Sequence, residues 1–418
     1  MRNLQGSKKG KIFMKPLEGV KVVELATMLA GPMCGRVLAE WGADVIKVES
    51  VNGDAWRIQY GTSLSPWTPK ANPHFDIQNI NKRFVCINMR TPEGQEIMEK
   101  LLSKSDVFLT NYREQALAGM GLSYDQVKKR FPRLVHAHVL GYGPEGPDKN
   151  RPGYDYTAFC ARTGFLGDLA PAGGPPLMTI AGVGDHLVAM NLAGGISAAL
   201  YERDKTGAGQ RVECSLLSTG IFMLSMGIHN AFNGRVLPRN RFDCAHATSN
   251  TYKCSDEEWF YLAIVDYRKF PVLCDVIGHP ELKDDERFVQ KNFYTAESRK
   301  ALTQIFDEIF AQKPVAYWHE LLTKNDLPHE PIVHLKDVLY DPQVIANQYA
   351  FIHEYADGTK GANTTSPVRF STVPKGSIPY RESRHRGADN EEILERLGYS
   401  PEQIAEFLEK NAIAKGDK

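Results

Sequence analysis

The sequence has no excess of charge of either sign, because its 418 residues include 50 Lys and Arg against 50 Asp and Glu. A neutral chain has no overall field that would draw it to nucleic acid or to an anionic membrane surface. We therefore expect neither nucleic acid nor a membrane as a partner. An anionic ligand would have to bind through a local group of positive side chains.

The sequence also has few cysteines, and none of them are paired in a metal-binding or redox spacing. Its seven cysteines stand at positions 34, 86, 160, 214, 244, 254 and 274. The absence of any C-x-x-C pair argues against a zinc ribbon or a dithiol site. Scattered single thiols are typical of a reducing compartment, so we expect a cytoplasmic protein.

No apolar run is long enough for a signal peptide or well suited to spanning a membrane. The basic N-terminus, residues 1–15, has no apolar core, and we expect a loose extension ahead of the fold. The longest uncharged run, residues 214–234, contains serines, a threonine, a histidine and asparagines. We interpret it as one long buried helix over about 215–232 rather than a membrane span.

Short β-branched runs alternate with helical patterns over the first 200 residues. Strands are predicted at 20–25, 43–49, 84–89, 107–110 and 134–140. Gly31 and Pro32 open one helix, and Thr91 begins another through a capping pattern. Strand, helix and strand in this rhythm predict right-handed crossovers and a mainly parallel sheet, which is an α/β fold.

The pattern changes twice further along the chain. Residues 141–184 are rich in glycine and proline, which indicates the kind of loop that holds ligands at the carboxyl ends of parallel strands. A nearly uncharged helix, buried on most faces, is predicted over 185–202. Beyond it we expect a smaller α+β domain at 235–330, with a strand at 259–265 and an amphipathic helix at 298–313. Two short helices are expected near the C-terminus.

Several short motifs suggest familiar chemistry but lack its requirements. The run GYGPEG at 141–146 matches G-x-G-x-x-G after a strand, yet the prolines in and after it would break the helix of a dinucleotide site. The run HEPIVH at 329–334 is one residue too long for a zincin and contains a proline, so no metal site is expected. Ser218 lacks the glycines of a nucleophile elbow. Cys160 lacks a basic neighbour in the sequence that would activate its thiol.

Two aspartates remain as candidates for chemistry. Asp155 lies between Tyr154 and Tyr156, where the Gly/Pro-rich loop meets a helix, and Asp185 follows a short glycine motif at the start of another helix. An aspartate in such a position commonly caps a helix by accepting a backbone N–H. The residues alone leave open whether either carboxylate reacts or only caps.

A set of longer motifs resembles one enzyme family. The chain contains, in order, KPLEGVKVVEL, AGPMCGRVLAEWGADVIKVE, NKRFVCINMRTPEG, SDVFLTNYREQAL, GYGPEGPDKNRPGYDYTAF and GAGQRVECSLL. In this combination it resembles the class III CoA-transferases over nearly all of residues 14–400. The segments DIQNINKR, NYREQAL and GPDKNRPGYDYTAF are most similar to the branch that acts on aryl-lactates and other 2-hydroxy acids.

The resemblance implies an architecture and a set of partners. It implies a Rossmann-like large domain over 16–234, the smaller α+β domain over 235–330, and a C-terminal segment over 331–418 that returns to the large domain. It also implies an interlocked homodimer. The substrates would be an acyl-CoA and a carboxylic acid, with no cofactor beyond coenzyme A as co-substrate.

The resemblance also implies roles for individual residues. The family's aspartate nucleophile falls on Asp155. The positions expected to bind CoA are Met28, Leu29, Ala30, Ile87, Arg90, Asn111, Tyr112, Arg113 and Tyr142. The positions expected to line the substrate pocket are Tyr154, Gly184, Asp185 and His186.

The chain departs from the oxalate-type members at the phosphate-binding positions. Ser50, Gly119 and Leu140 stand where those enzymes carry basic residues. Phosphate binding is therefore expected to depend more on Arg90, with Arg113 and Arg57 as further candidates. The run CAHATSNTY at 244–252 replaces a run of glycines, which argues against an acceptor as small as oxalate.

The chemistry explains why an aspartate suits this reaction. A carboxyl group with the ordinary pKa of about 3.9 is ionised at neutral pH and can attack a thioester carbonyl without a helper base. We expect Asp155 to be incompletely hydrogen-bonded, because a fully capped carboxylate is a poor nucleophile. Backbone N–H groups around 141–143 or 182–184 are candidates for stabilising the oxyanions.

Two other functions remain open from the sequence. The same superfamily contains 2-methylacyl-CoA racemases, which place a histidine at the position of Tyr154 and a second acid near Asp185. A tyrosine, with a pKa of about 10, is a poor substitute for a histidine proton shuttle. A CoA-binding protein without catalysis is the third possibility.

Overall fold

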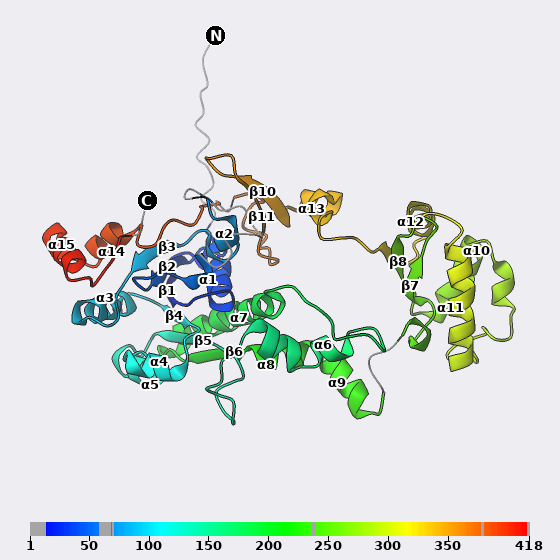
Figure 1. The fold of residues 1–418 in the computed structure, drawn as a ribbon, viewed down its shortest axis with the longest axis horizontal. Coiled ribbons are helices and arrows are strands. Elements are labelled where there is room, and N and C mark those ends of the chain that lie inside the picture. Colours follow the sequence, from blue (N-terminus) through cyan, green and yellow to red (C-terminus); the bar gives the residue numbers. More distant parts are fainter. Residues whose placement is uncertain (1–13, 58–67, 69–70, 236–239, 378–379, 416–418) are drawn as a thin grey trace, which may run out of the picture. The chain divides into compact units, whose positions relative to one another are not determined.

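The structure is a computed structural model that describes residues 14–57, 68, 71–235, 240–377 and 380–415. The chain divides into two compact units (Figure 1). Unit 1 comprises Met1–Phe165, Met178–Ser225 and Asp341–Lys418, and unit 2 comprises Leu166–Leu177 and Met226–Tyr340. The expected N-terminal extension lies outside the described residues except for Met14 and Lys15.

Unit 1 is built on a six-stranded, wholly parallel sheet with the strand order β3-β2-β1-β4-β5-β6. Its strands are β1 (Lys21–Leu25), β2 (Asp44–Glu49), β3 (Arg83–Cys86), β4 (Val107–Thr110), β5 (Val135–Leu140) and β6 (Arg211–Ser215). The prediction of a parallel α/β fold is confirmed. The order reverses between β1 and β4, so a crevice opens at the carboxyl ends of these two strands.

Helices cover both faces of this sheet. On one face α1 (Ala30–Glu40) packs against α7 (Val183–Thr206). On the other, α3 (Pro92–Ser103), α14 (Asn390–Arg396) and α15 (Pro401–Glu409) enclose an apolar core. The other elements of unit 1 are α2 (Pro73–Asn79), α4 (Glu114–Gly119), α5 (Tyr124–Arg130), α8 (Leu216–Met223), α13 (Pro342–Asn347) and the hairpin of β10 (Ala350–Glu354) and β11 (Lys360–Thr364).

Local sequence explains where these elements begin and end. The Thr91 hydroxyl accepts the N–H of Gly94 at 3.1 Å, which confirms the predicted start of α3. Strand β3 ends at Cys86, before the predicted residue 89: Ile87 still donates to the carbonyl of Glu49 at 2.9 Å but forms an isolated antiparallel bridge with Ile413 on its other side. Helix α7 is buried along one side only, and Tyr201 on its other side is exposed. The expectation that most of its faces are buried is wrong.

The C-terminal part of unit 1 completes the edge of the sheet. The N–H of Phe84 donates to Asp389 Oδ2 at 2.8 Å, and the N–H of Cys86 donates to Asn390 Oδ1 at 2.9 Å. The outward-facing donors of β3, the first strand in the order, are therefore satisfied by side chains rather than by another strand.

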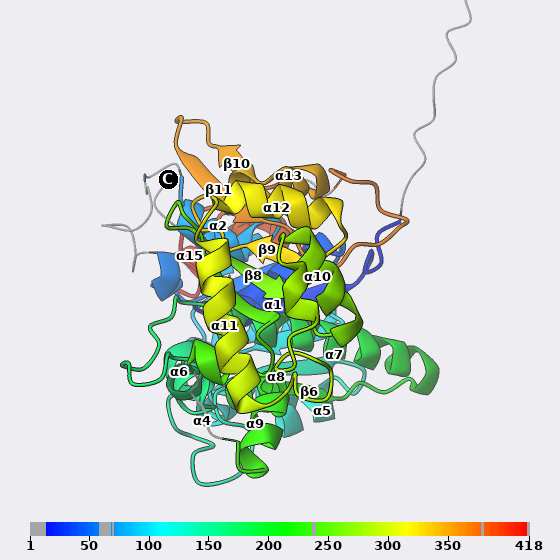
Figure 2. The same cartoon turned by 90° about the vertical axis from the view of Figure 1, so that its right-hand side faces the viewer.

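Unit 2, whose yellow helices face the viewer in Figure 2, has an apolar core of its own. An antiparallel sheet of β7 (Ser249–Lys253), β8 (Trp259–Ala263) and β9 (His329–Pro331) packs with α10 (Phe270–Val276), α11 (Ala296–Phe310) and α12 (Val315–Lys324). Tyr252, Phe260 and Phe310 stack at its centre with ring centroids 4.9 to 6.1 Å apart. Two further helices, α6 (Phe165–Asp168) and α9 (Ser225–Phe232), lie where the two units join along the chain.

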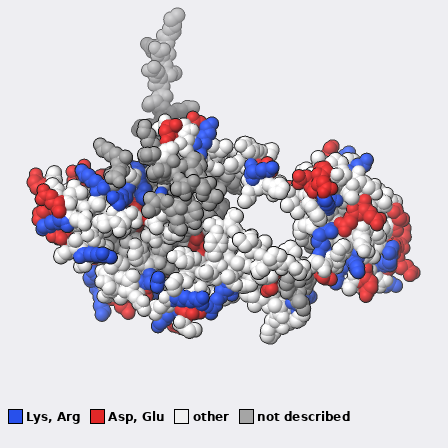
Figure 3. All heavy atoms as spheres, in the orientation of Figure 1, with Lys and Arg blue, Asp and Glu red and all other residues white. Residues whose placement is uncertain are grey.

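The uncharged run 214–234 does not form the single buried helix that the sequence suggested. It forms the end of β6 and two helices, α8 and α9, separated at Leu224. The side chains of Phe222, Met226 and Phe232 are 79%, 72% and 89% exposed. The run therefore carries large apolar groups on the surface, and Figure 3 shows few charges over α9. Among the described residues, every helix is too short or too polar to cross a bilayer.

Candidate active site

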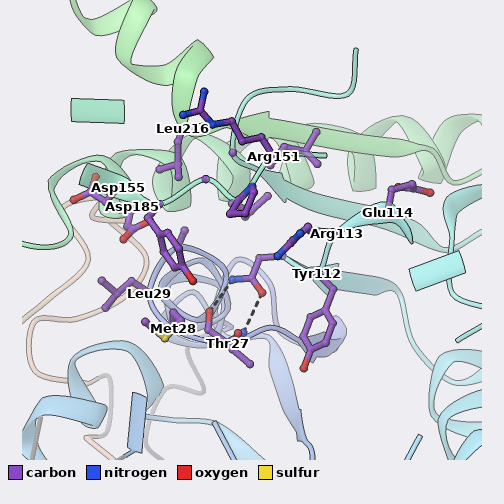
Figure 4. Close-up of a pocket in the computed structure, with 18 of the residues that line it drawn as sticks. Thr27, Met28, Leu29, Tyr112, Arg113, Glu114, Arg151, Asp155, Asp185 and Leu216 are labelled. Carbon is purple, nitrogen blue, oxygen red and sulfur yellow. Dashed lines mark hydrogen bonds between the residues drawn. The ribbon is translucent and has the colours of Figure 1, made fainter. Parts of the chain in front are cut away.

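A large pocket opens in unit 1 at the crevice where the strand order reverses. Its volume is about 1120 Å³, which exceeds the usual range for a drug-sized ligand and suits a longer one. The loops after β1 and β4 line it together with the segments around Asp155 and Asp185, and Tyr112 and Arg113 lie on the opposite side of the view from the two aspartates (Figure 4). The predicted residues that line it are Met28, Leu29, Ala30, Asn111, Tyr112, Arg113, Tyr154, Asp155 and Asp185.

Three side chains fix the loop that follows β1. Asn111 pairs with both backbone groups of Thr27, accepting its N–H at 3.0 Å and donating to its carbonyl at 2.7 Å (Figure 4). Asp54 accepts the N–H of Met28 at 3.1 Å, and Lys47 donates to the carbonyl of Ala26 at 2.7 Å. Met28 has a φ of 66°, a conformation that a residue with a side chain rarely adopts unless its surroundings hold it.

The charges behind this loop are completely buried. Lys47 lies 2.9 Å from Asp54 and 3.1 Å from Glu24, and Lys82 lies 2.8 Å from Glu24. Burial alone would lower the pKa of Lys47, but the nearby carboxylates outweigh it and raise that pKa. For Lys82 the effect of burial exceeds that of Glu24, and the pKa of Lys82 falls to about 8. Our sequence analysis missed this cluster, because its members lie singly in strands and loops.

The carboxylate of Asp155 is held from both sides. It lies in the first residue of a π-helical segment, Asp155–Ala161, and is 4% exposed. Its Oδ2 accepts the N–H of Gly182 at 2.9 Å, and its Oδ1 accepts the N–H of Gly184 at 2.8 Å. Each oxygen has one backbone donor, so two of the about four acceptor positions of the carboxylate are filled by backbone N–H groups. Asp155 thus binds the start of α7, whereas the N-cap of its own helix is Tyr154.

A glycine at position 184 is required for this arrangement. A Cβ on Gly184 would lie 2.5 Å from Asp155 Oδ1 and 2.3 Å from the ring of Phe159. The thiol of Cys160 lies 3.9 Å from the same oxygen. Burial and the Asp155 charge raise the pKa of Cys160 to about 12, so the thiol stays protonated at neutral pH.

Asp185 lies beside Asp155 in the first turn of α7. The N-cap of that helix is Gly182, so Asp185 lies inside the helix and is not its cap. Burial, and then the negative charge of Asp155, raise the pKa of Asp185 to about 7. His186 lies against Gly182 with a buried Nε2 that has no hydrogen-bond partner among the described residues, and burial lowers its pKa.

The predicted CoA-binding residues do not all lie in this pocket. Ile87 is buried in the core near α3, Arg90 is exposed, and Tyr142 lines a smaller neighbouring cavity. None of these three belongs to the lining of the large pocket. Arg57 is paired with Glu49 at 2.7 Å.

Two cations that the sequence analysis did not single out also line the pocket. Lys149 and Arg151 line it together with Arg113, and both come from the Gly/Pro-rich loop after β5. The signal that could have found them is the basic pattern KNR within that loop. Within the described ranges, no three His, Cys, Asp or Glu side chains gather in a way that could hold a metal ion.

Comparisons with known proteins agree on one family. The family model of CoA-transferase family III matches residues 17–388. An (R)-2-hydroxy-4-methylpentanoate CoA-transferase of Clostridioides difficile is 39% identical over 95% of this chain and 99% of its own length. A cinnamoyl-CoA:phenyllactate CoA-transferase of Clostridium sporogenes is 34% identical over 94% and 96%. The crystal structure of a CAIB/BAIF family protein from Brucella suis superposes with a TM-score of 0.77 at 29% identity, covering 92% of this chain and 99% of that one.

Proposed function

Because the chain belongs to CoA-transferase family III, we propose that it moves CoA from an acyl-CoA to a free 2-hydroxy acid through covalent intermediates on Asp155. Enzymes of this family use CoA thioesters as co-substrate. The observation that carries the proposal is the Asp155 carboxylate, buried at one end of a long pocket and held by two backbone N–H groups.

The first half of the cycle transfers the donor's acyl group and then CoA to Asp155. A carboxylate oxygen attacks the thioester carbonyl, the carbon–sulfur bond breaks, and CoA leaves as a thiolate from a mixed anhydride. The thiolate then attacks Cγ of Asp155. The anhydride bond breaks, the donor acid leaves as a carboxylate, and an aspartyl-CoA thioester remains.

The second half repeats these steps in reverse with the acceptor. The acceptor carboxylate attacks Cγ of Asp155 and releases the thiolate, which then attacks the acceptor's carbonyl and frees Asp155. No net proton or electron is gained or lost. When Cγ becomes tetrahedral, the oxygen that carries the negative charge can keep its own N–H bond, which comes from Gly182 for Oδ2 and from Gly184 for Oδ1 and is already aligned in the free enzyme.

The other end of the pocket suits CoA. The loop of Met28, Leu29 and Ala30 and the turn of Asn111 and Tyr112 would contact the nucleotide and the pantetheine arm. Arg113, Lys149 and Arg151 are the cations that would bind the phosphates, since Arg57 is already paired. CoA contacts of Ile87, Arg90 and Tyr142 stay predictions, as does a part for Gly184 and His186 in the substrate pocket.

The proposed acceptor is a 2-hydroxy acid, or its enoate, with a branched or aryl side chain. Two similar relatives are named for such acids, and Tyr154 and Tyr156 give the pocket aromatic walls. A screen of acyl-CoA donors against oxalate, succinate and 2-hydroxy acids tests the proposal. We expect 2-hydroxy acids to be the best acceptors, and a preference for oxalate would contradict it.

Chemical trapping tests the covalent step. Acyl-CoA alone should modify the protein, and hydroxylamine should then convert Asp155 to a hydroxamate that mass spectrometry locates. An unmodified Asp155 peptide after this treatment, in protein that transfers CoA, would exclude the proposed intermediates.

One observation favours a second candidate, the 2-methylacyl-CoA racemase reaction. An acid with a pKa near 7, such as Asp185, can move a proton at neutral pH. Incubation of a 2-methylacyl-CoA in D₂O separates the two candidates. A racemase incorporates deuterium at the α-carbon without any acceptor acid, whereas the proposed transferase does not.

We also propose that the protein is a homodimer. The exposed apolar side chains of α8 and α9 would be covered by a second copy. The interlocked arrangement that the family resemblance implies stays a prediction.

A further inference from the structure

Asp185 differs from its neighbour Asp155 in having no hydrogen-bond partner. Its side chain lines the pocket and is 8% exposed, yet no donor among the described residues reaches its carboxyl group. The Asp155 carboxylate, by comparison, accepts two backbone N–H groups. A largely buried polar group without a partner costs free energy. An arrangement of this kind is favourable when a ligand supplies the missing hydrogen bond.

The position of Asp185 relative to Asp155 identifies which part of a ligand would reach it. Asp185 directly follows Gly184, whose N–H holds Asp155 Oδ1, and Figure 4 shows the two aspartates at the same end of the pocket. Their electrostatic coupling also indicates that the two carboxyl groups are near each other. In an anhydride between Asp155 and a 2-hydroxy acid, only C1 and C2 separate the bridging oxygen from the 2-hydroxyl oxygen. The hydroxyl group must therefore lie beside Asp155.

We propose that Asp185 binds the 2-hydroxyl group of the acid substrate and thereby selects 2-hydroxy acids over the corresponding acids without that group. The inference rests on the proposed function and adds the residue that recognises the acid. The hydroxyl donates its hydrogen bond to a carboxyl oxygen of Asp185. No covalent bond to Asp185 forms or breaks.

Three other polar groups near Asp155 are not suited to this role, and His186, whose Nε2 also lacks a partner among the described residues, does not line the pocket. The N–H groups of Gly182 and Gly184 are already engaged with Asp155 itself. The Cys160 thiol is fully buried and directed at Asp155 Oδ1. A site whose buried acceptor needs a hydroxyl discriminates strongly against an analogue that lacks it, because the acceptor is then left unpaired.

The test compares two acids that differ only in the hydroxyl group, 2-hydroxy-4-methylpentanoate and 4-methylpentanoate, with one acyl-CoA donor. Asp185→Leu keeps the branched shape without an acceptor, and Asp185→Ala removes the side chain. We expect both variants to lower the ratio of the two kcat/KM values by about 10- to 100-fold. The kcat/KM for the hydroxy acid should fall, whereas the kcat/KM for 4-methylpentanoate should stay within about threefold of the wild-type value. Glu145→Gln, which removes an exposed carboxylate of the loop after β5, should leave the ratio unchanged.

If kcat/KM falls equally for both acids in both folded Asp185 variants, the proposal is overturned. A binding experiment separates its failure from that of the proposed function. Calorimetry with CoA present measures each acid binding to Asp155→Asn and to the Asp155→Asn/Asp185→Leu double variant, neither of which needs to turn over. Selective weakening of the hydroxy acid in the double variant supports the role of Asp185 even if the wild type transfers CoA to no acid. Equal binding of the two acids to Asp155→Asn contradicts it.

Discussion

Asn111 bonds to both backbone groups of Thr27, accepting its N–H at 3.0 Å and donating to its carbonyl at 2.7 Å. The two residues follow β4 and β1, the neighbouring strands at which the sheet order reverses. One amide side chain thus joins two loops that both line the pocket. The two loops are therefore held together before any ligand binds.

Replacing Asn111 by alanine should therefore weaken CoA binding more than it slows the chemical steps. Loss of two hydrogen bonds, each contributing about 1 kcal/mol, should raise KM for acyl-CoA by about 10- to 100-fold. The kcat should change much less, because the donors that hold Asp155 are the N–H groups of Gly182 and Gly184, which this change leaves in place. Steady-state kinetics measure both constants. Asn52→Ala, in an exposed loop position after β2, serves as the control and should leave KM unchanged.

Asp155→Asn should abolish turnover and also destabilise the protein. The amide can accept only one of the two N–H groups that the carboxylate accepts, and its own NH₂ then faces the other. We expect turnover to fall by several orders of magnitude, and the free energy of unfolding to fall by about 1 to 3 kcal/mol. Denaturant melts and a CoA-transfer assay measure the two effects. Near-normal CoA transfer by the variant, with deamidation excluded by mass spectrometry, would refute the assignment of Asp155 as the nucleophile.

Gly184→Ala tests the close packing against Asp155. The new methyl group would lie 2.5 Å from Asp155 Oδ1, so the carboxylate or the start of α7 has to move. We expect a loss of about 1 to 3 kcal/mol in stability and a large loss of kcat. Gly194→Ala is the matched control in the same helix, because a Cβ there meets nothing within 4 Å. It should leave activity intact and stabilise the helix by up to about 1 kcal/mol.

The raised pKa of Asp185 makes stability depend on pH. The folded protein holds this proton up to a pH of about 7, whereas an ordinary aspartate, with its pKa of 3.8, loses it much earlier. As pH rises between these values the folded state therefore loses stability relative to the unfolded state. Asp185→Asn removes the effect, and should be more stable than wild type by up to about 4 kcal/mol at pH 8. The difference should vanish near pH 3. Chemical denaturation across this range measures it, and a constant difference would contradict the assignment.

The proposed dimer can be tested on α8. Phe222→Asp places a charge on a side chain that is 79% exposed in the single chain. If a second copy covers this surface, sedimentation should show a dimeric wild type and a variant shifted toward monomer, with both chains folded by circular dichroism. Glu145→Gln is the control on an exposed polar position. A wild type that remains monomeric at micromolar concentration would rule the dimer out.

Much of the fold could be predicted because its signals are local. The apolar runs at β1, β2, β4 and β5 and the cap at Thr91 depend only on neighbouring residues, and the structure has them where expected. The run 214–234 was misread because low charge is shared by buried helices and by apolar surfaces, and sequence periodicity does not separate the two cases.

The site was harder to predict because its contacts are distant in sequence. Asp155 and Asp185 stood out as residues, but the bonds from Asp155 to Gly182 and Gly184 join segments 27 and 29 residues apart. The cluster of Lys47, Glu24 and Asp54 comes from two strands and a loop. No local pattern distinguishes such charges from ordinary surface residues.

The side chains that close the edge at β3 have a consequence for how the protein avoids aggregation. An open edge strand can recruit a strand from another molecule, because its N–H and C=O groups are unpaired. The side chains of Asp389 and Asn390 accept the N–H groups of Phe84 and Cys86, so these donors are not free to pair with a strand of another molecule. A chain that ended before residue 389 would lose more than α14 and α15. It would expose an apolar β edge on which identical molecules could stack.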